Sequence, residues 1–170
     1  MIAMLKNGLF PTAISWRPLV WATALLLLLA VVDRPLHQFS TFLVPPFAAT
    51  LSILLYLPQQ PVAQPLPVII GSTLTSALGT GLALFLHGPI AAVAVAAGLL
   101  WLLPRVGLYH PPAIALAMYP LLLKPGPWFP IAVVLPFTLV AVLSHLFLSR
   151  RVPDWPLYPR KTPEDAASAE

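Results

Sequence analysis

The sequence predicts an all-α polytopic membrane protein, and composition together with charge placement carries this prediction. Apolar residues make up 59% of the 170 residues, whereas charged residues make up only 8%. Because a soluble domain carries about a quarter charged residues, this chain could not cover a water-facing surface. Nearly all of the charge lies toward the two ends, and between Pro35 and Ser149 only Arg105 and Lys124 are formally charged. The apolar stretches between the ends therefore indicate membrane helices.

Composition also divides the chain into three parts. We expect residues 1–18 to form an N-terminal cytoplasmic segment, 19–148 the transmembrane domain and 149–170 a disordered cytoplasmic tail, since the end of the chain is polar and rich in proline. The first apolar run lacks a small-residue cleavage site, so we interpret it as an uncleaved span rather than a signal peptide.

Six apolar segments predict the helices in order. Their approximate bounds are Leu19–Val32, Thr41–Leu57, Val68–Leu86, Ile90–Leu103, Pro112–Leu123 and Trp128–Leu148. A helix needs about 20 residues to cross the hydrocarbon core. The third and sixth segments meet that length and the fifth does not, so we expect four to six transmembrane segments.

A proline doublet occurs twice and suggests an internal repeat. Pro45-Pro46 lies near the start of the second segment, Pro111-Pro112 begins the fifth, and each is followed by a proline-bearing loop and a long apolar segment. Six crossings would make this a 3+3 inverted repeat with two short Pro-started half-helices, as in many transporters. Two alternatives remain: re-entrant short segments would leave four crossings, and the doublets could coincide by chance in a chain with 22 prolines. Either crossing number is even and places both termini in the cytoplasm.

Several function classes are excluded or disfavoured by the sequence. The net charge of +4 comes mainly from Lys and Arg near the chain ends, as the positive-inside rule expects, and does not indicate nucleic-acid binding. The chain has no cysteine, its four histidines lack metal-ligand spacing, and no Asp or Glu lies between Arg34 and Arg150. We therefore predict no metal, no cofactor and no enzymatic activity.

The doublets are the first candidate site. Proline suits the first turn of a helix because its missing N–H would be unpaired there. The N–H groups that follow would lack intrahelical partners and would favour an anion. The alternative is that the prolines only start helices, whose ends water or a carbonyl caps. The candidate substrate-binding residues here are Pro46, Phe47, Ala48, Ala49, Pro111, Pro112, Ala113 and Ile114, with Ala115 completing the second copy.

His110 is the sharpest single candidate, because it directly precedes the second doublet. An ionisable group at membrane depth is a functional-site candidate by default, and its imidazole could donate to an anion or take a proton. The alternative is a wet flanking position at the membrane interface. Gln64, in the proline-rich loop before the third segment, is a further candidate donor that could reach back to the site.

The third segment carries one face of small and hydroxyl-bearing residues, Ser72, Thr75, Ser76 and Gly79. Such a face lets helix backbones approach closely and lets hydroxyls bond across the contact, so we interpret it as a packing face. The alternative is that this face lines a polar path through the protein.

At these residues the chain resembles the HPP family of integral membrane proteins, which is named for the tripeptide standing here as His110-Pro111-Pro112. The likeness extends over roughly Val44 to Leu148 and includes Pro46-Phe47-Ala48-Ala49-Thr50, Pro61-Val62-Ala63-Gln64-Pro65 and Gly71. The chain departs from the family pattern at Ala48 and Ile114, where glycine is common, and at Ser72, where histidine is frequent.

The resemblance implies a substrate class, because chloroplast and cyanobacterial members are linked to nitrite transport. We therefore expect a multi-pass inner-membrane protein, embedded in the lipid bilayer, that passes a small monovalent inorganic anion such as nitrite. A homo-oligomer is compatible with this interpretation. The main alternative is a non-transporting scaffold or accessory subunit, and a membrane enzyme using His110 is the weakest rival.

Overall fold

The computed structural model describes residues 15–33 and 43–160, and every regular element in them is helical. The helices are α2 (Trp16–Asp33), α3 (Pro45–Tyr56), α4 (Ser72–Leu82), α5 (Pro89–Arg105), α6 (Pro111–Leu123) and α7 (Leu135–Arg151). Each of the six predicted apolar segments overlaps one of them. The predicted all-α class is therefore confirmed for the described part of the chain, while the number of crossings stays a prediction.

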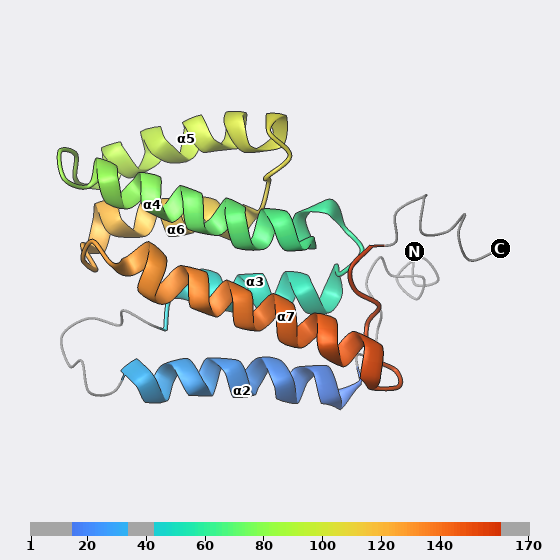
Figure 1. The fold of residues 1–170 in the computed structure, drawn as a ribbon. Coiled ribbons are helices and arrows are strands. Elements are labelled where there is room, and N and C mark those ends of the chain that lie inside the picture. The colour runs from blue at the N-terminus through green and yellow to red at the C-terminus, as the bar shows by residue number, and fades with distance from the viewer. Residues whose placement is uncertain (1–14, 34–42, 161–170) are drawn as a thin grey trace, which may run out of the picture.

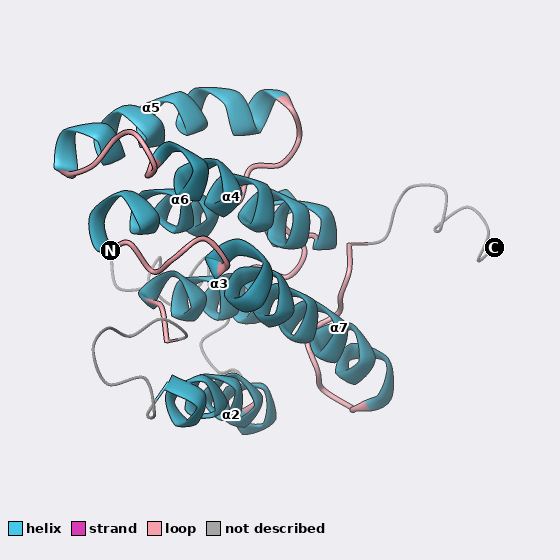
Figure 2. Cartoon of the chain, turned by 60° about the vertical axis from the view of Figure 1, so that its left-hand side comes forward, coloured by secondary structure: helices cyan, strands magenta, loops and turns pink. Residues whose placement is uncertain are grey.

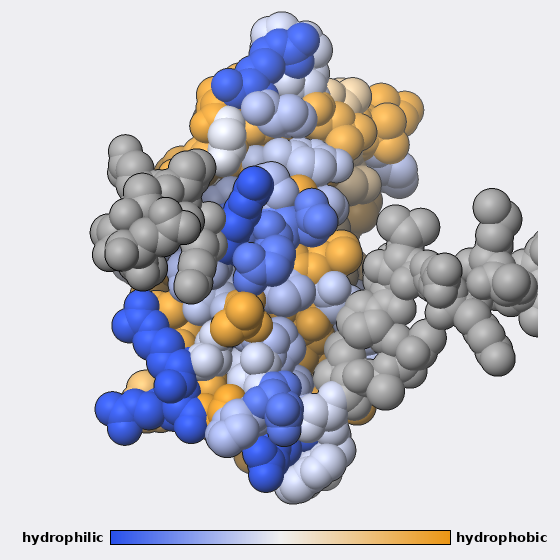
Figure 3. Space-filling model, turned by 90° about the vertical axis from the view of Figure 1, so that its right-hand side faces the viewer, coloured by the Kyte–Doolittle hydropathy of each residue, from blue (hydrophilic) through white to orange (hydrophobic). Residues whose placement is uncertain are grey.

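Successive helices run in alternating directions along one bundle (Figure 1). The edges are formed by α2 and α5, with α3, α4, α6 and α7 between them (Figure 2). The start of α2 and the end of α7 lie at the same end of the bundle, which carries Arg17, Arg150 and Arg151 and which we call the basic end. Hydrophilic residues are spread over much of this end (Figure 3).

Helix length separates two classes of element. Trp16–Asp33 has 18 residues and Pro130–Arg151 has 22, and both are long and apolar enough to cross a membrane. By contrast, α3 has 12 residues and α6 has 13. At 1.5 Å per residue these two helices are only about 20 Å long, well short of the roughly 30 Å hydrocarbon core.

The last helix in each half of the chain, α4 in the first half and α7 in the second, follows a π-helical turn. A π-helical turn at Pro67–Gly71 leads into α4, and another at Pro130–Val134 leads into α7. The contacts are reciprocal, because the turn before α4 packs against α7 and the turn before α7 packs against α4. Proline begins both turns, where its missing N–H leaves no intrahelical bond unmade.

Side chains of the main core come chiefly from α3 and α7. The rings of Phe47 and Phe137 stack with their centroids 3.9 Å apart. Leu51, Leu54 and Ala141 are buried in the same cluster. A smaller cluster joins α5 to α6.

The small-residue face of α4 packs against α6, as predicted. Thr75 Oγ1 donates a hydrogen bond of 2.8 Å to the carbonyl oxygen of Ala113. A Cβ atom built on Gly79 would lie 2.0 Å from the carbonyl oxygen of Ala117, so only glycine allows this approach. Ser72 and Ser76 on this face are also fully buried.

Large apolar side chains cover the sides of the bundle. Leu27, Leu100, Trp101, Leu143 and Phe147 are each more than half exposed. A soluble monomer rarely exposes so much apolar surface, whereas lipid requires it.

We expected a disordered tail from residue 149 onward, but the segment of residues 149–160 is ordered. Residues 149–151 form the last turn of α7, and Trp155 and Tyr158 are buried against the bundle. The Tyr158 hydroxyl donates to the carbonyl oxygen of Ala63 at 2.9 Å, and the Tyr158 N–H donates to Ser149 Oγ at 2.8 Å. Aromatic side chains with polar tips anchor the segment, which composition alone did not reveal. Residues 161–170 lie outside the described residues.

Candidate functional site

The two proline doublets form the first turns of α3 and α6. Each has proline at its first two positions, and the preceding residue, Val44 or His110, is extended. Proline disfavours the helical conformation in the residue before it, so the doublets set where both helices begin. The predicted proline-started helix starts are therefore present.

The backbone donors at these starts are not free, which corrects the expected anion-binding geometry. The Phe47 N–H donates to the Val44 carbonyl oxygen, and the Ala113 N–H donates to the His110 carbonyl oxygen, both at 2.9 Å. The prolines have no N–H, and residues from Ala48 and Ile114 onward lie where an α-helix bonds its own N–H groups. What each start retains is the positive end of its helix dipole.

Both doublets line one groove on the outer face of the bundle. Its volume is about 540 Å³, and it is wide open on one side. The lining residues are Pro45, Pro46, Ala49, Ser52, Ile53, Pro111, Pro112 and Ala115. The tertiary structure thus joins two starts that are far apart in the sequence.

The predicted site residues of the doublet regions divide between this groove and the core. Pro46, Ala49, Pro111 and Pro112 line the groove. Phe47, Ala113 and Ile114 face the core instead, and Ala48 is exposed outside the groove lining. The division follows helical periodicity, because residues one apart point to different sides of a helix.

His110 lies directly behind the groove wall, where it connects three parts of the chain. Its side chain is 0% exposed, so His110 is not a water-exposed flanking residue at the membrane interface. His110 Nδ1 lies 2.8 Å from the carbonyl oxygen of Val62, and Nε2 lies 3.0 Å from Thr50 Oγ1. Thr50 Oγ1 in turn lies 3.1 Å from the carbonyl oxygen of Pro46. The imidazole therefore links the start of α6 to α3 and to the turn at Pro61–Ala63.

Thr50 belongs to the stretch that carries the family likeness, but the sequence analysis did not predict it as a site residue. It is 0% exposed and faces the core of the bundle between apolar neighbours. The available signal was its place four residues after Pro46, where a threonine hydroxyl reaches back to a helix carbonyl. Its pairing with His110, which is 60 residues away, had no signal in the sequence.

Gln64 does not reach the doublets. Its Nε2 donates to the carbonyl oxygens of Pro58 and Gln60 at 3.0 and 2.9 Å, and its Oε1 accepts from the Arg160 N–H at 2.9 Å. The side chain thus ties the loop after α3 to the segment after α7, and it is not assembled with His110.

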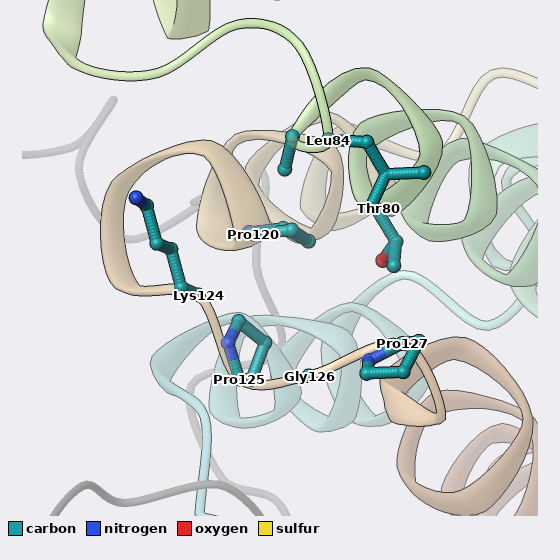
Figure 4. Close-up of a pocket in the computed structure, with 8 residues that line it drawn as sticks. Thr80, Leu84, Pro120, Lys124, Pro125, Gly126 and Pro127 are labelled. Atoms are coloured by element: carbon teal, nitrogen blue, oxygen red, sulfur yellow. The ribbon is translucent and has the colours of Figure 1, made fainter.

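A second cavity lies where α4 and α6 end, opposite the basic end of the bundle in Figure 1, and its lining is drawn in Figure 4. Its volume is about 240 Å³, and its lining is Thr80, Ala83, Leu84, Pro120, Lys124, Pro125, Gly126 and Pro127. Only Thr80 and Lys124 in this lining have polar side chains. None of the residues predicted for the site from the sequence lines this cavity, so it stands apart from the groove.

His145 is the other buried histidine and stands apart from the groove. Its ring packs against Trp21 and Tyr158, and its Nδ1 accepts a hydrogen bond of 3.2 Å from Trp155 Nε1. Within residues 15–33 and 43–160, no three His, Cys, Asp or Glu side chains are grouped so that they could hold a metal ion.

Comparison with known proteins gives one family. The model of the family described as "HPP, transmembrane region" matches residues 10–159. No curated protein and no solved structure matches the chain.

Proposed function

The chain belongs to the HPP transmembrane family, and from this membership and the groove between the doublets we propose that it transports a small monovalent anion across the membrane. Nitrite is the candidate substrate. The proposal takes the groove as the anion site and His110 as the side chain that responds to the anion.

One observation carries this proposal: the two short helices α3 and α6 begin beside each other within the bundle. Transporters of small solutes often use interrupted helices whose N-termini point at the substrate. Here α3 and α6 are the short helices, and their first turns share the groove. The reciprocal packing of the two π-helical turns supports an inverted repeat around this point.

Electrostatics favours an anion over a cation. The positive ends of the α3 and α6 dipoles meet at the groove, and each end is equivalent to about half a positive charge. No Asp or Glu occurs between Arg34 and Pro153 to bind a cation or relay a proton. Serine, proline, alanine and isoleucine side chains line the groove without adding negative charge.

The positive-inside rule sets the orientation that we propose. The basic end faces the cytoplasm of an inner membrane, with both termini there and six crossings between them. This orientation places the loop after α6 on the opposite side.

The test is nitrite uptake into proteoliposomes. Ala49→Leu adds bulk to the groove at an exposed position and leaves the core unchanged, so we expect uptake to fall at least tenfold. Ala97→Leu, on the exposed face of α5, is the matched control and should retain uptake. His110→Ala should also reduce uptake.

The uptake results separate the proposal from its alternatives. Equal uptake by Ala49→Leu and the unchanged protein would remove the groove from the path. Uptake by the unchanged protein no faster than in protein-free liposomes would contradict transport of nitrite.

The scaffold alternative has its own support, since every first-turn N–H described above already has a partner. It predicts that no small anion raises the thermal stability of the protein.

A further inference from the structure

We propose that the anion site takes up one proton together with each anion, and that His110 and Thr50 form the proton-binding pair. This inference rests on the proposed anion transport and names its co-substrate. Both side chains are 0% exposed, and they lie directly behind residues Ala49 and Pro111 of the groove lining.

The hydrogen bonds of neutral His110 are fixed by its partners. The Val62 carbonyl can only accept, so Nδ1, at 2.8 Å, carries the proton and donates. In the neutral ring Nε2 is then an acceptor, and the Thr50 hydroxyl donates to it across 3.0 Å. All polar atoms of the imidazole are satisfied in this state.

Protonation of His110 leaves the same atoms satisfied. Both ring nitrogens then donate, and Thr50 Oγ1 accepts from Nε2. The single proton of the Thr50 hydroxyl rotates to the carbonyl oxygen of Pro46, which lies 3.1 Å away. A hydroxyl with one proton and two acceptors within reach thus lets the site gain a proton without losing a hydrogen bond.

What opposes protonation is charge rather than hydrogen bonding. The titratable groups of the elements that contact His110 are Tyr56 of α3 and Tyr119 of α6, and Tyr158 bonds to the turn at Pro61–Ala63. Tyrosine is neutral at physiological pH, so none of them supplies a negative charge. The positive dipole ends of α3 and α6 add to the cost of a buried imidazolium.

An anion in the groove supplies the missing counter-charge. Anion and proton then bind as a neutral pair, and each raises the affinity for the other by the same factor. Transport of the pair moves no net charge across the membrane. The coupling therefore predicts that a pH gradient drives uptake and that the membrane potential does not.

The experiment is the affinity of the purified protein for sodium nitrite as a function of pH. Where free His110 is neutral, uptake of one proton per anion makes the affinity fall tenfold per pH unit. His110→Gln keeps a side chain that can donate and accept but cannot take a proton, so the affinity should become independent of pH. Thr50→Val should flatten the pH profile, and Thr50→Ser should restore it because the hydroxyl returns.

His87→Gln is the matched control, since His87 is exposed at the turn between α4 and α5 and should leave the profile unchanged. Nitrite binding or uptake without pH dependence would overturn the coupling and leave anion transport standing. A pH dependence that persists in His110→Gln would likewise overturn it. Absence of both binding and uptake would contradict the transport proposal and this inference together.

Discussion

Gly79 shows how one residue sets the spacing of two helices. Its lack of a side chain lets α4 approach α6 until a Cβ would meet the Ala117 carbonyl oxygen at 2.0 Å. The Thr75 hydroxyl bonds to the Ala113 carbonyl oxygen across the same contact. Because Ala113 follows the second doublet, this contact also positions the start of α6 beside the groove.

We expect Gly79→Ala to destabilise the protein by about 1–3 kcal/mol, the usual cost of overpacking. The new methyl group would force α4 and α6 apart, because its nearest neighbour is backbone and cannot rotate away. Thermal unfolding in detergent measures the effect. Gly98→Ala is the matched control, since nothing lies within 4 Å of its Cβ and alanine favours a helix. Equal stability of the two variants would contradict the close approach.

At the scale of elements, the segment 152–160 holds the basic end together. Trp155 bonds to His145 of α7, and the Tyr158 hydroxyl bonds to the Ala63 carbonyl oxygen in the turn that is hydrogen-bonded to His110. Burial raises the pKa of the Tyr158 phenol, so this donor keeps its proton at physiological pH. The segment therefore supports the loop whose Val62 carbonyl orients His110.

Tyr158→Phe tests this support. The change leaves the buried Ala63 carbonyl oxygen without its partner, and we expect a loss of about 1–3 kcal/mol in stability. Faster proteolysis after α7 should accompany the loss. Tyr56→Phe, at a position that is 37% exposed, should change neither property. An unaltered melting temperature in Tyr158→Phe would show that the hydrogen bond does not stabilise the fold.

At the scale of the whole molecule, alternating helix directions place the loop after α3 at the basic end and the loop after α6 at the opposite end (Figure 1). Six crossings put these loops on opposite sides of the membrane. Re-entrant second and fifth segments would instead put both outside, because the chain would return to the side from which it entered.

The chain has no cysteine, so single substitutions can report the side of each loop. We expect Gln60→Cys to react only from the cytoplasmic side and Trp128→Cys only from the outer side, as labelling with a membrane-impermeant thiol reagent in intact cells and inverted vesicles will show. Both native residues are exposed. Labelling of both positions from outside would favour four crossings.

The membrane class, the six helical segments and the starts of α3 and α6 were readable from the sequence, because they depend on local composition and on what proline does to its own helix turn. The packing face of α4 was readable for the same reason, since residues one helical turn apart share a face. Tertiary structure alone decided that the two doublets share a groove, that Val44 and His110 cap the donors expected to be free, and that Gln64 lies elsewhere. It also paired His110 with Thr50 across 60 residues. Such pairings depend on which helix faces meet when the chain packs, and spacing along the chain does not encode that choice.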